Sequence, residues 1–341
     1  GWNHLHDRKC GICCRYECGR ELFLIKILRI FIIMIKKNEC QIEKGDGKCC
    51  FLSFSVMIRY IRKNIRECES EAGIFMDITM LGTGNAMVTE CYNTCFVLRD
   101  GDKHLLVDGG GGNTLLAQLK HAGFDWMDMR EIFVTHKHVD HIMGIVWMIR
   151  MICQHMKQGQ YEGEATIYGH EEVIRILKEM AEMLYPKKQT CYIGDRLHLV
   201  VLEDGEERIL MGHKTTFFDI QSTKAKQFGF CMDMGNGEKF TCCGDEPYNE
   251  CEKKYAENSK WLLHEAFCLF DQADRFHPYE KHHSTAKDAS ELAEQLGVQN
   301  LILYHTEDKN IARRKELYTE EGKKYFSGNL YVPEDLEKIE L

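Results

Sequence analysis

The stretch Ile132-Phe133-Val134-Thr135-His136-Lys137-His138-Val139-Asp140-His141-Ile142-Met143-Gly144 contains three histidines and one aspartate within six residues. The β-branched and aromatic residues before them predict a short strand. Side chains alternate along an extended segment, so His136 and His138 point the same way and can reach one ion. The apolar residues that follow recur at helical spacing, which predicts a helix. We therefore expect Asp140 and His141 where the strand turns into this helix, because a helix N-terminus favours an anion.

Nitrogen and oxygen ligands packed this tightly suit zinc. His136 and His138 face one way and Asp140 and His141 another, which favours two ions about 3.5–4 Å apart over a single ion. The alternative is a histidine-rich surface turn. That alternative would be preferred for a lone pair of histidines. The fuller H-x-H-x-D-H pattern between a strand and a helix instead predicts a metal site.

The composition indicates whether the chain can form a core and in which cellular compartment it is expected. The chain has 341 residues and is 44% hydrophobic, which is enough to bury a sizeable core. Its 17 cysteines have no regular spacing across the chain, and no convincing cleavable signal precedes them. A disulfide framework is therefore not expected, and we predict a reducing, cytoplasmic location.

Charge differs between the two parts of the chain. Residues 1–75 contain 14 Lys and Arg against 9 Asp and Glu, so the other 266 residues contain 30 against 44. The second part is clearly acidic, which argues against a large nucleic-acid surface and leaves a local basic patch open.

The first 75 residues show little strand or turn pattern. Their apolar run Leu22–Ile35 is interrupted by Lys26 and Arg29, so we expect no transmembrane segment and interpret the run as an amphipathic surface helix. The spacing of four nearby cysteines fits structural zinc sites poorly. We predict an N-terminal extension of uncertain structure in residues 1–75 and a catalytic domain in residues 76–341. The oligomeric state stays open, with a homodimer as one option.

Further strands of the catalytic domain also end in chemically active residues. Val107-Asp108 runs into the glycines 109–112, which we interpret as a close approach of backbone to the metal centre rather than a phosphate loop. A predicted strand delivers Gly244-Asp245, and another ends in His305. A second carboxylate is what a two-metal site needs as a bridging ligand. The candidate metal ligands are His136, His138, Asp140, His141, Asp245 and His305.

The sequence also predicts several elements away from the ligands. Apolar spacing predicts a helix over residues 171–184, and Asn236-Gly237 predicts a hairpin turn. Ser284 or Thr285 is expected to cap a helix over residues 286–296, and a final strand is expected near residues 329–332.

These segments resemble the metallo-β-lactamase superfamily, and within it the ribonuclease Z-like hydrolases. The resemblance covers residues 76–341 and rests on the following pieces: Leu81-Gly82-Thr83-Gly84, Val107-Asp108-Gly109-Gly110, the histidine motif, Gly244-Asp245, His264-Glu265-Ala266, His283-Ser284-Thr285 and Leu303-Tyr304-His305. It implies an α+β fold, the four-layer αβ/βα sandwich, with two mixed or mostly antiparallel sheets face to face, helices outside and the site at one edge.

The resemblance also implies roles for the candidate ligands. His136 and His138 would bind a first metal, and Asp140, His141 and His305 a second. Asp245 would bridge the two. Glu265 and His283 match the pair that assists phosphodiester cleavage in that family; a helix-capping turn and a buried ion pair are the alternative for these two residues.

Two departures from the family pattern stand out. The family has one more histidine ligand on the strand before Gly-Asp, where we find Gln221; His213 lies eight residues earlier and is a poor substitute. The chain also lacks the long Gly/Pro-rich basic insertion with which ribonuclease Z grips transfer RNA. RNA is therefore not the favoured partner, and the first metal should be held less tightly.

We accordingly predict a metal-dependent hydrolase, a phosphodiesterase or ribonuclease Z-like nuclease that uses a metal-bound hydroxide. Its catalytic residues would be Asp140, His283 and Glu265, with two zinc ions, or manganese, as cofactor. Its partner would be a phosphodiester or another small hydrolysable substrate. The alternatives are a lactone or thioester hydrolase on the same fold and a metal-binding protein without turnover.

Overall fold

The computed structural model describes residues 76–341. The predicted N-terminal extension, its apolar run and its cysteines lie outside the described residues. Two seven-stranded sheets organise the described part of the chain. The first sheet has, in spatial order, β14 (Lys338–Glu340), β1 (Asp77–Gly82), β2 (Cys95–Asp100), β3 (Lys103–Val107), β4 (Glu131–Phe133), β5 (Ala165–Gly169) and β6 (Leu197–Val201).

The second sheet repeats this plan. Its spatial order is β13 (Asn329–Tyr331), β12 (Asn300–Tyr304), β11 (Trp261–Glu265), β10 (Glu238–Cys242), β9 (Phe228–Gly235), β8 (His213–Asp219) and β7 (Glu207–Leu210). In each sheet, three consecutive pairings are antiparallel and the other three are parallel. The sheets are therefore mixed, as predicted.

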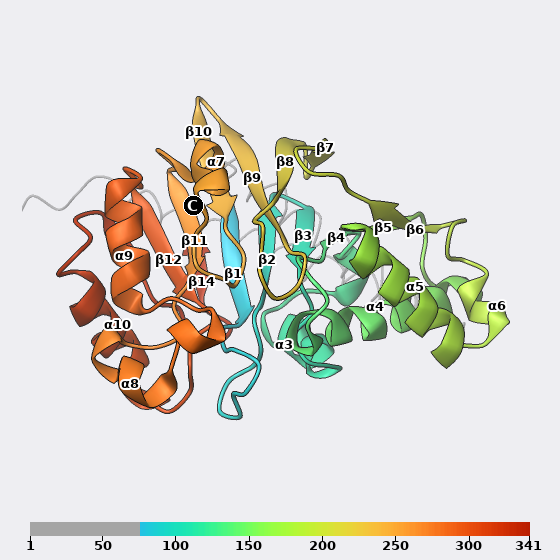
Figure 1. Cartoon of the computed structure of the whole chain (residues 1–341). Coiled ribbons are helices and arrows are strands. Elements are labelled where there is room, and N and C mark those ends of the chain that lie inside the picture. The colour runs from blue at the N-terminus through green and yellow to red at the C-terminus, as the bar shows by residue number, and fades with distance from the viewer. Residues whose placement is uncertain (1–75) are drawn as a thin grey trace, which may run out of the picture. The chain divides into compact units, whose positions relative to one another are not determined.

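Parallel neighbours need long crossover connections, and helices provide them. The helix α4 joins β4 to β5, α5 joins β5 to β6, α9 joins β11 to β12, and α10 joins β12 to β13 (Figure 1). The helices are α3 (Thr114–His121), α4 (Val139–Lys157), α5 (Glu171–Leu184), α6 (Lys187–Thr190), α7 (Lys253–Ala256), α8 (Ala273–Phe276), α9 (Ala286–Gln295) and α10 (Arg314–Gly322). Short 3-10 turns span Trp126–Asp128, Glu250–Glu252, Phe270–Gln272, Tyr279–Lys281 and Ile311–Arg313.

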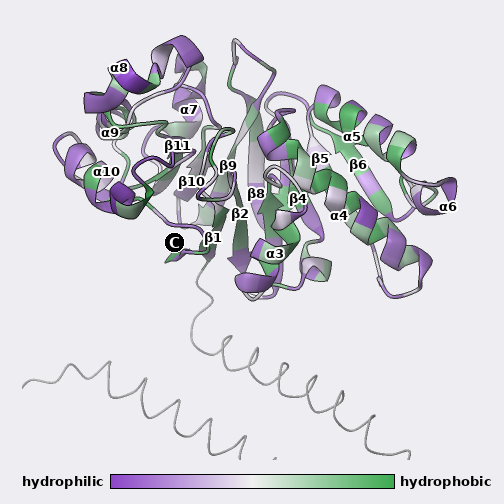
Figure 2. Cartoon of the chain, turned by 90° about the horizontal axis from the view of Figure 1, so that it is seen from below, coloured by the Kyte–Doolittle hydropathy of each residue, from purple (hydrophilic) through white to green (hydrophobic). Residues whose placement is uncertain are grey.

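Three hydrophobic clusters bind the layers together. The middle cluster lies between the two sheets and is rich in phenylalanine, including Phe96, Phe133, Phe217, Phe230 and Phe240. One outer cluster joins the first sheet to α3, α4 and α5, and the other joins the second sheet to α9 and α10. Figure 2 shows α8 and α10 with largely hydrophilic residues on the outside of the molecule. This layering is the predicted four-layer αβ/βα sandwich.

Several local predictions are confirmed. The helix expected over residues 171–184 is α5. Asn236 and Gly237 form the predicted hairpin turn between β9 and β10, with φ of 55° and 78°, as a two-residue type I′ turn requires. Thr285 caps α9 through a capping box with Asp288. Among residues 76–341, none of the helices is both long enough and apolar enough to cross a bilayer.

Two predictions about strands are wrong. The strand before the histidine motif ends at Phe133, so His136 and His138 lie in the loop between β4 and α4 rather than on a strand. The strand near Asn329 is not the last one, because Lys338–Glu340 follows as β14 and pairs with β1. Only three residues long, β14 carries no recognisable period, and its pairing partner decides its conformation.

Candidate metal centre

The glycine loop after β3 packs directly against the start of α4. Gly109 N–H donates to the carbonyl of His141 at 2.8 Å, and Gly144 N–H donates to the carbonyl of Gly110 at 3.0 Å. A Cβ on Gly144 would overlap the Gly109 carbonyl. The glycines therefore serve the close backbone approach that the sequence predicts, and this approach holds Asp140 and His141 at the edge of the sheet.

Asp108 connects the ligands of the first sheet. It follows β3 with a left-handed φ of 59°, a conformation that aspartate tolerates better than most residues. One carboxylate oxygen accepts from Thr135 N–H at 2.8 Å, and the other accepts from Thr135 Oγ1 at 2.8 Å and His141 Nδ1 at 2.7 Å. The proton of His141 therefore lies on Nδ1, which leaves the Nε2 lone pair for a metal ion.

Thr135 also sets the tautomer of His136. Its single hydroxyl proton goes to Asp108, so His136 Nδ1, at 2.9 Å from Oγ1, must be the donor of that hydrogen bond. His136 Nε2 is then free to accept and lies 2.8 Å from His138 Nδ1. The imidazoles of His136 and His138 therefore approach each other within a loop, and not through the side-chain alternation of a strand that the sequence predicts.

Asp245 and His305 come from the second sheet. Asp245 follows β10 after Gly244, whose φ is 80°, and His305 follows β12 with φ 57°. Asp245 Oδ2 lies 3.5 Å from His136 Nε2, 3.4 Å from His141 Nε2 and 3.4 Å from His305 Nε2. A central position among three imidazoles is what the proposed bridging role requires.

The donor set fits divalent cations. His141 Nε2, His305 Nε2 and Asp245 Oδ1 are buried and make no hydrogen bond within residues 76–341, and buried polar atoms are rarely left without a partner. Two ligand groups overlap at this point: His136, His141 and Asp245, and Asp140, His141 and His305. The structure thus brings together the six predicted ligands, with His138 joined to the first group through its contact with His136.

The electrostatics of the cluster also favour a cation. Burial opposes ionisation of Asp245 and Asp140, yet the surrounding histidines hold the pKa of both carboxyls below the usual range. Burial lowers the pKa of His136. Burial also opposes charge on His141, but Asp140 and Asp108 together raise its pKa well above the ordinary value. A site with this negative potential attracts positive charge, and a metal ion would compete with a proton there.

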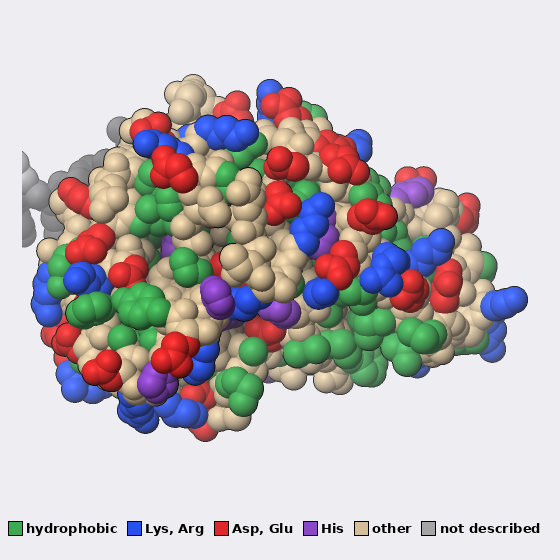
Figure 3. All heavy atoms as spheres, in the orientation of Figure 1, with side chains coloured by type: hydrophobic (Ala, Val, Ile, Leu, Met, Phe, Trp, Pro, Cys, Tyr) green, Lys and Arg blue, Asp and Glu red, His purple; other side chains and the backbone are tan. Residues whose placement is uncertain are grey.

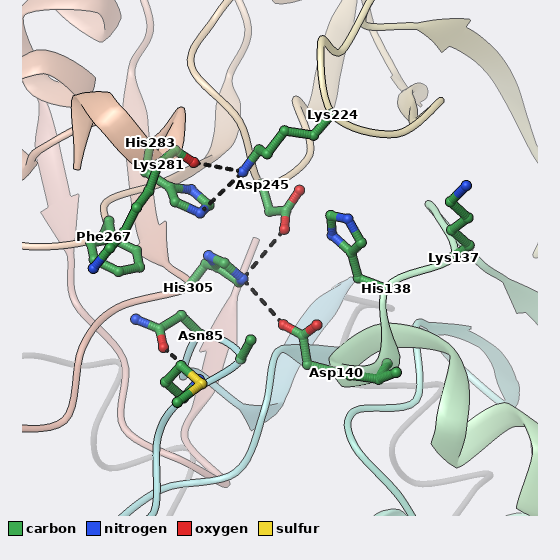
Figure 4. A pocket seen from close by; sticks show the side chains of 13 residues that line it. Asn85, Lys137, His138, Asp140, Lys224, Asp245, Phe267, Lys281, His283 and His305 are labelled. Atoms are coloured by element: carbon green, nitrogen blue, oxygen red, sulfur yellow. Dashed lines mark hydrogen bonds and ion pairs between the residues drawn. The ribbon is translucent and has the colours of Figure 1, made fainter. Parts of the chain in front are cut away.

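A pocket of about 560 Å³ opens onto the ligand cluster. His138, Asp140, Asp245 and His305 line it together with His283, whose ring stacks on Phe267 at 4.7 Å between centroids (Figure 4). His283 Nδ1 lies 3.6 Å from Glu265 Oε2, so the predicted pair does come together beside the ligands. The opposite oxygen of Glu265 accepts from Ser284 N–H.

The structure does not place Gln221 at the position where the family resemblance expects a further histidine ligand. Gln221 is exposed, has φ 57° and does not line the pocket, and His213 binds Asp100 at 2.7 Å outside the site. The residue of this segment that does line the pocket is Lys224. Sequence reasoning missed Lys224, and it gave Asp108 and Thr135 no role. The one sequence signal for a role of Asp108 is its position at the end of a predicted strand, directly before a glycine.

Comparisons with known proteins identify the family and the fold of the chain. A family model described as anti-Pycsar protein Apyc1 matches residues 76–326. A ribonuclease Z of Methanothermobacter thermautotrophicus is 27% identical over 311 residues, which cover 78% of this chain and 97% of that protein. Among solved structures, the metallo-β-lactamase fold protein YhfI from Bacillus subtilis has a TM-score of 0.63 at 19% identity, covering 78% of this chain and 100% of its own. Human tRNase Z, short form, has a TM-score of 0.58 at 20% identity, covering 77% and 98%.

Proposed function

The chain belongs to the anti-Pycsar protein Apyc1 family and is a ribonuclease Z-like member of the metallo-β-lactamase superfamily, and from this membership we propose that it is a metal-dependent phosphodiesterase. One observation carries the proposal. The buried ligand cluster and the Glu265–His283 pair line or adjoin the same pocket, so a scissile bond held at the ligands lies within reach of His283. The similarity to a ribonuclease Z supports phosphodiester chemistry.

Two zinc ions are the cofactor that we propose. His136, His138 and Asp245 would hold one, and Asp140, His141, His305 and the shared Asp245 the other. When bound, zinc would supply water with a lowered pKa and stabilise the negative charge that develops on the phosphoryl oxygens. Manganese is the second candidate metal, because carboxylate and imidazole ligands also suit it.

The side chains of the protein would orient the reaction. Asp140 lies in the first turn of α4 and lines the pocket, so its carboxylate can orient an attacking water as well as bind metal. His283 is held between the ring of Phe267 and the carboxylate of Glu265, which positions its Nε2 toward the pocket. From there His283 would steady or protonate the leaving oxygen.

The pocket volume and the charge of the chain favour a small phosphodiester. A pocket of about 560 Å³ is in the range of sites for small molecules. Lys137, Lys224 and Lys281 line it although the second part of the chain is acidic overall, so positive charge is concentrated where an anionic substrate would enter. Figure 3 shows histidine side chains near the middle of one face, with basic side chains (Lys or Arg) beside them. RNA remains the second candidate substrate.

The cytoplasm is the location that we propose. The cysteines of residues 76–341 are all free thiols, and most of them are buried or partly buried. Free thiols in this number suit a reducing compartment.

Substrate turnover by the full chain tests the proposal. The protein, stripped with a chelator and reloaded with zinc or manganese, would be assayed on bis-p-nitrophenyl phosphate, p-nitrophenyl phosphate, a lactone, a thioester, a cyclic nucleotide and a precursor transfer RNA. We expect metal-dependent hydrolysis of at least one phosphodiester and little turnover of the lactone and thioester.

The substitution Asp140→Ala tests whether the ligand cluster is the catalytic site. It removes a metal ligand and the carboxylate that orients water, so we expect phosphodiester hydrolysis to fall at least about 1,000-fold, measured as kcat/KM. Asp125→Ala, on an exposed turn outside the pocket, is the control. Asp140→Ala activity within a few-fold of wild type, or turnover of the lactone or thioester alone, would reject the proposed function.

A further inference from the structure

Lys224 lies beside the ligand cluster on the segment between β8 and β9. This segment is the one where the family resemblance places another histidine ligand. Lys224 Nζ donates to the carbonyl of Lys281 at 2.8 Å and lies 3.3 Å from His283 Nε2. An ammonium group has no acceptor, so His283 Nε2 accepts this hydrogen bond and the ring proton lies on Nδ1, toward Glu265.

The loop that carries Lys224 is well tied down. Ser222 Oγ accepts from the backbone N–H groups of Lys224 and Ala225, both at 3.2 Å, and donates to Glu246 Oε1 at 2.8 Å. Thr223 Oγ1 contacts His282 Nδ1 at 3.2 Å. The amine of Lys224 is therefore presented to the pocket by a loop with several anchors.

Lys224 differs from the other two lysines that line the pocket. Lys137 Nζ is paired with Glu172 at 2.7 Å, and Lys281 Nζ donates to the Phe276 carbonyl at 2.7 Å. Figure 4 shows the Lys224 amine directed toward His283, and the Lys137 amine directed away from the histidines. Among residues 76–341, the one carboxylate within 4 Å of the Lys224 amine is that of Glu246, at 3.8 Å, and its Oε1 already accepts from Ser222.

We propose that Lys224 is a substrate-binding residue whose ammonium group binds a non-bridging phosphoryl oxygen, next to His283. The inference rests on the proposed function, because it takes the substrate to be a phosphodiester. A bound phosphoryl oxygen would take the place of His283 Nε2 as acceptor for Lys224. His283 Nε2 would then be free to carry a proton and to donate it to the leaving oxygen of the same anion. A charged hydrogen bond of this kind adds geometric specificity as well as affinity.

The test compares Lys224→Gln, Lys224→Arg and the control Lys214→Gln in the full chain loaded with zinc; Lys214 pairs with Glu207 on the surface and lies outside the pocket. Calorimetric titration with inorganic phosphate measures anion binding without turnover, elemental analysis measures zinc content, and bis-p-nitrophenyl phosphate measures kcat/KM. We expect Lys224→Gln to weaken phosphate binding and lower kcat/KM by about 10- to 100-fold. Lys224→Arg should restore most of both, and Lys214→Gln should stay within about twofold of wild type.

The outcomes separate the two proposals. Unchanged phosphate affinity in Lys224→Gln, an equal loss in Lys214→Gln, or a loss of zinc in Lys224→Gln would overturn the role of Lys224. A wild type that hydrolyses no phosphodiester would instead reject the proposed function, and the phosphate titration would still decide whether Lys224 binds the anion.

Discussion

Asp108 shows how one residue outside the ligand set controls several ligands. It binds His141 directly and His136 through Thr135, and so it sets which nitrogen of each ring carries the proton. A neutral imidazole with its lone pair directed into the site is what a metal ion requires. The identity of residue 108 should therefore affect metal binding although Asp108 is not itself a proposed ligand.

Asp108→Asn tests this control. The amide can donate to His141 Nδ1, which would move the ring proton to Nε2 and direct it into the metal site. We expect zinc affinity to fall by about 10- to 100-fold, measured by competition with a chromogenic chelator. Asp100→Asn changes another aspartate that binds a histidine, His213, outside the site, and should leave zinc affinity unchanged. Equal zinc affinity in Asp108→Asn and wild type would contradict the role of Asp108.

At the scale of elements, the contact between the glycine loop and α4 positions Asp140 and His141. Gly144 lies inside a helix, where replacing glycine by alanine usually stabilises by up to about 1 kcal/mol. Here the added Cβ would overlap the Gly109 carbonyl. We expect Gly144→Ala to lower the free energy of unfolding by more than about 1 kcal/mol and to weaken zinc binding, measured by urea denaturation and zinc titration.

Gly112→Ala is the control for Gly144→Ala, because among residues 76–341 no heavy atom beyond its two chain neighbours lies within 4 Å of the position of its Cβ. It should change stability and zinc binding little. If Gly144→Ala were as stable as wild type, the close approach of the loop to α4 would not be needed to position the ligands.

Glu252 makes the turn before α7 sensitive to pH. It is fully buried, its Oε1 accepts from Asn249 N–H at 2.8 Å, and its Oε2 makes no hydrogen bond. Burial raises its pKa from 4.5 to about 8. Between these values the unfolded chain has lost the proton that the folded protein keeps, so stability falls as pH rises, by up to about 1.4 kcal/mol per pH unit, and levels off above about pH 8.

Glu252→Gln removes this titration. We expect its urea denaturation midpoint to fall less than that of wild type between pH 5.5 and about pH 8. Glu250→Gln changes an exposed neighbour in the same turn and should follow the wild-type profile. Parallel pH profiles for Glu252→Gln and wild type would show that Glu252 does not keep its proton in the folded protein.

At the scale of the whole molecule, residues 76–341 contain every proposed ligand and both sheets. Met76 packs in the cluster between the sheets, and its carbonyl accepts from Leu341 N–H at 2.9 Å. We predict that a chain beginning at Met76 stays soluble and binds as much zinc as the full chain, measured by size-exclusion chromatography and elemental analysis. A chain beginning at Gly84, which lacks β1, should aggregate. Aggregation or metal loss in the 76–341 chain would show that residues 1–75 belong to the core.

The sequence by itself determined most of the elements and the choice of candidate ligands. The motif from His136 to His141, the helix over residues 171–184 and the Asn236-Gly237 turn depend on neighbours along the chain, so their residue types and spacing were sufficient. The tertiary structure alone decided the hydrogen bonds of Asp108 to His141, the pairing of β14 with β1 and the presentation of Lys224 beside His283. These contacts join residues far apart in sequence, and no local pattern encodes which distant groups the packing of two sheets will bring together.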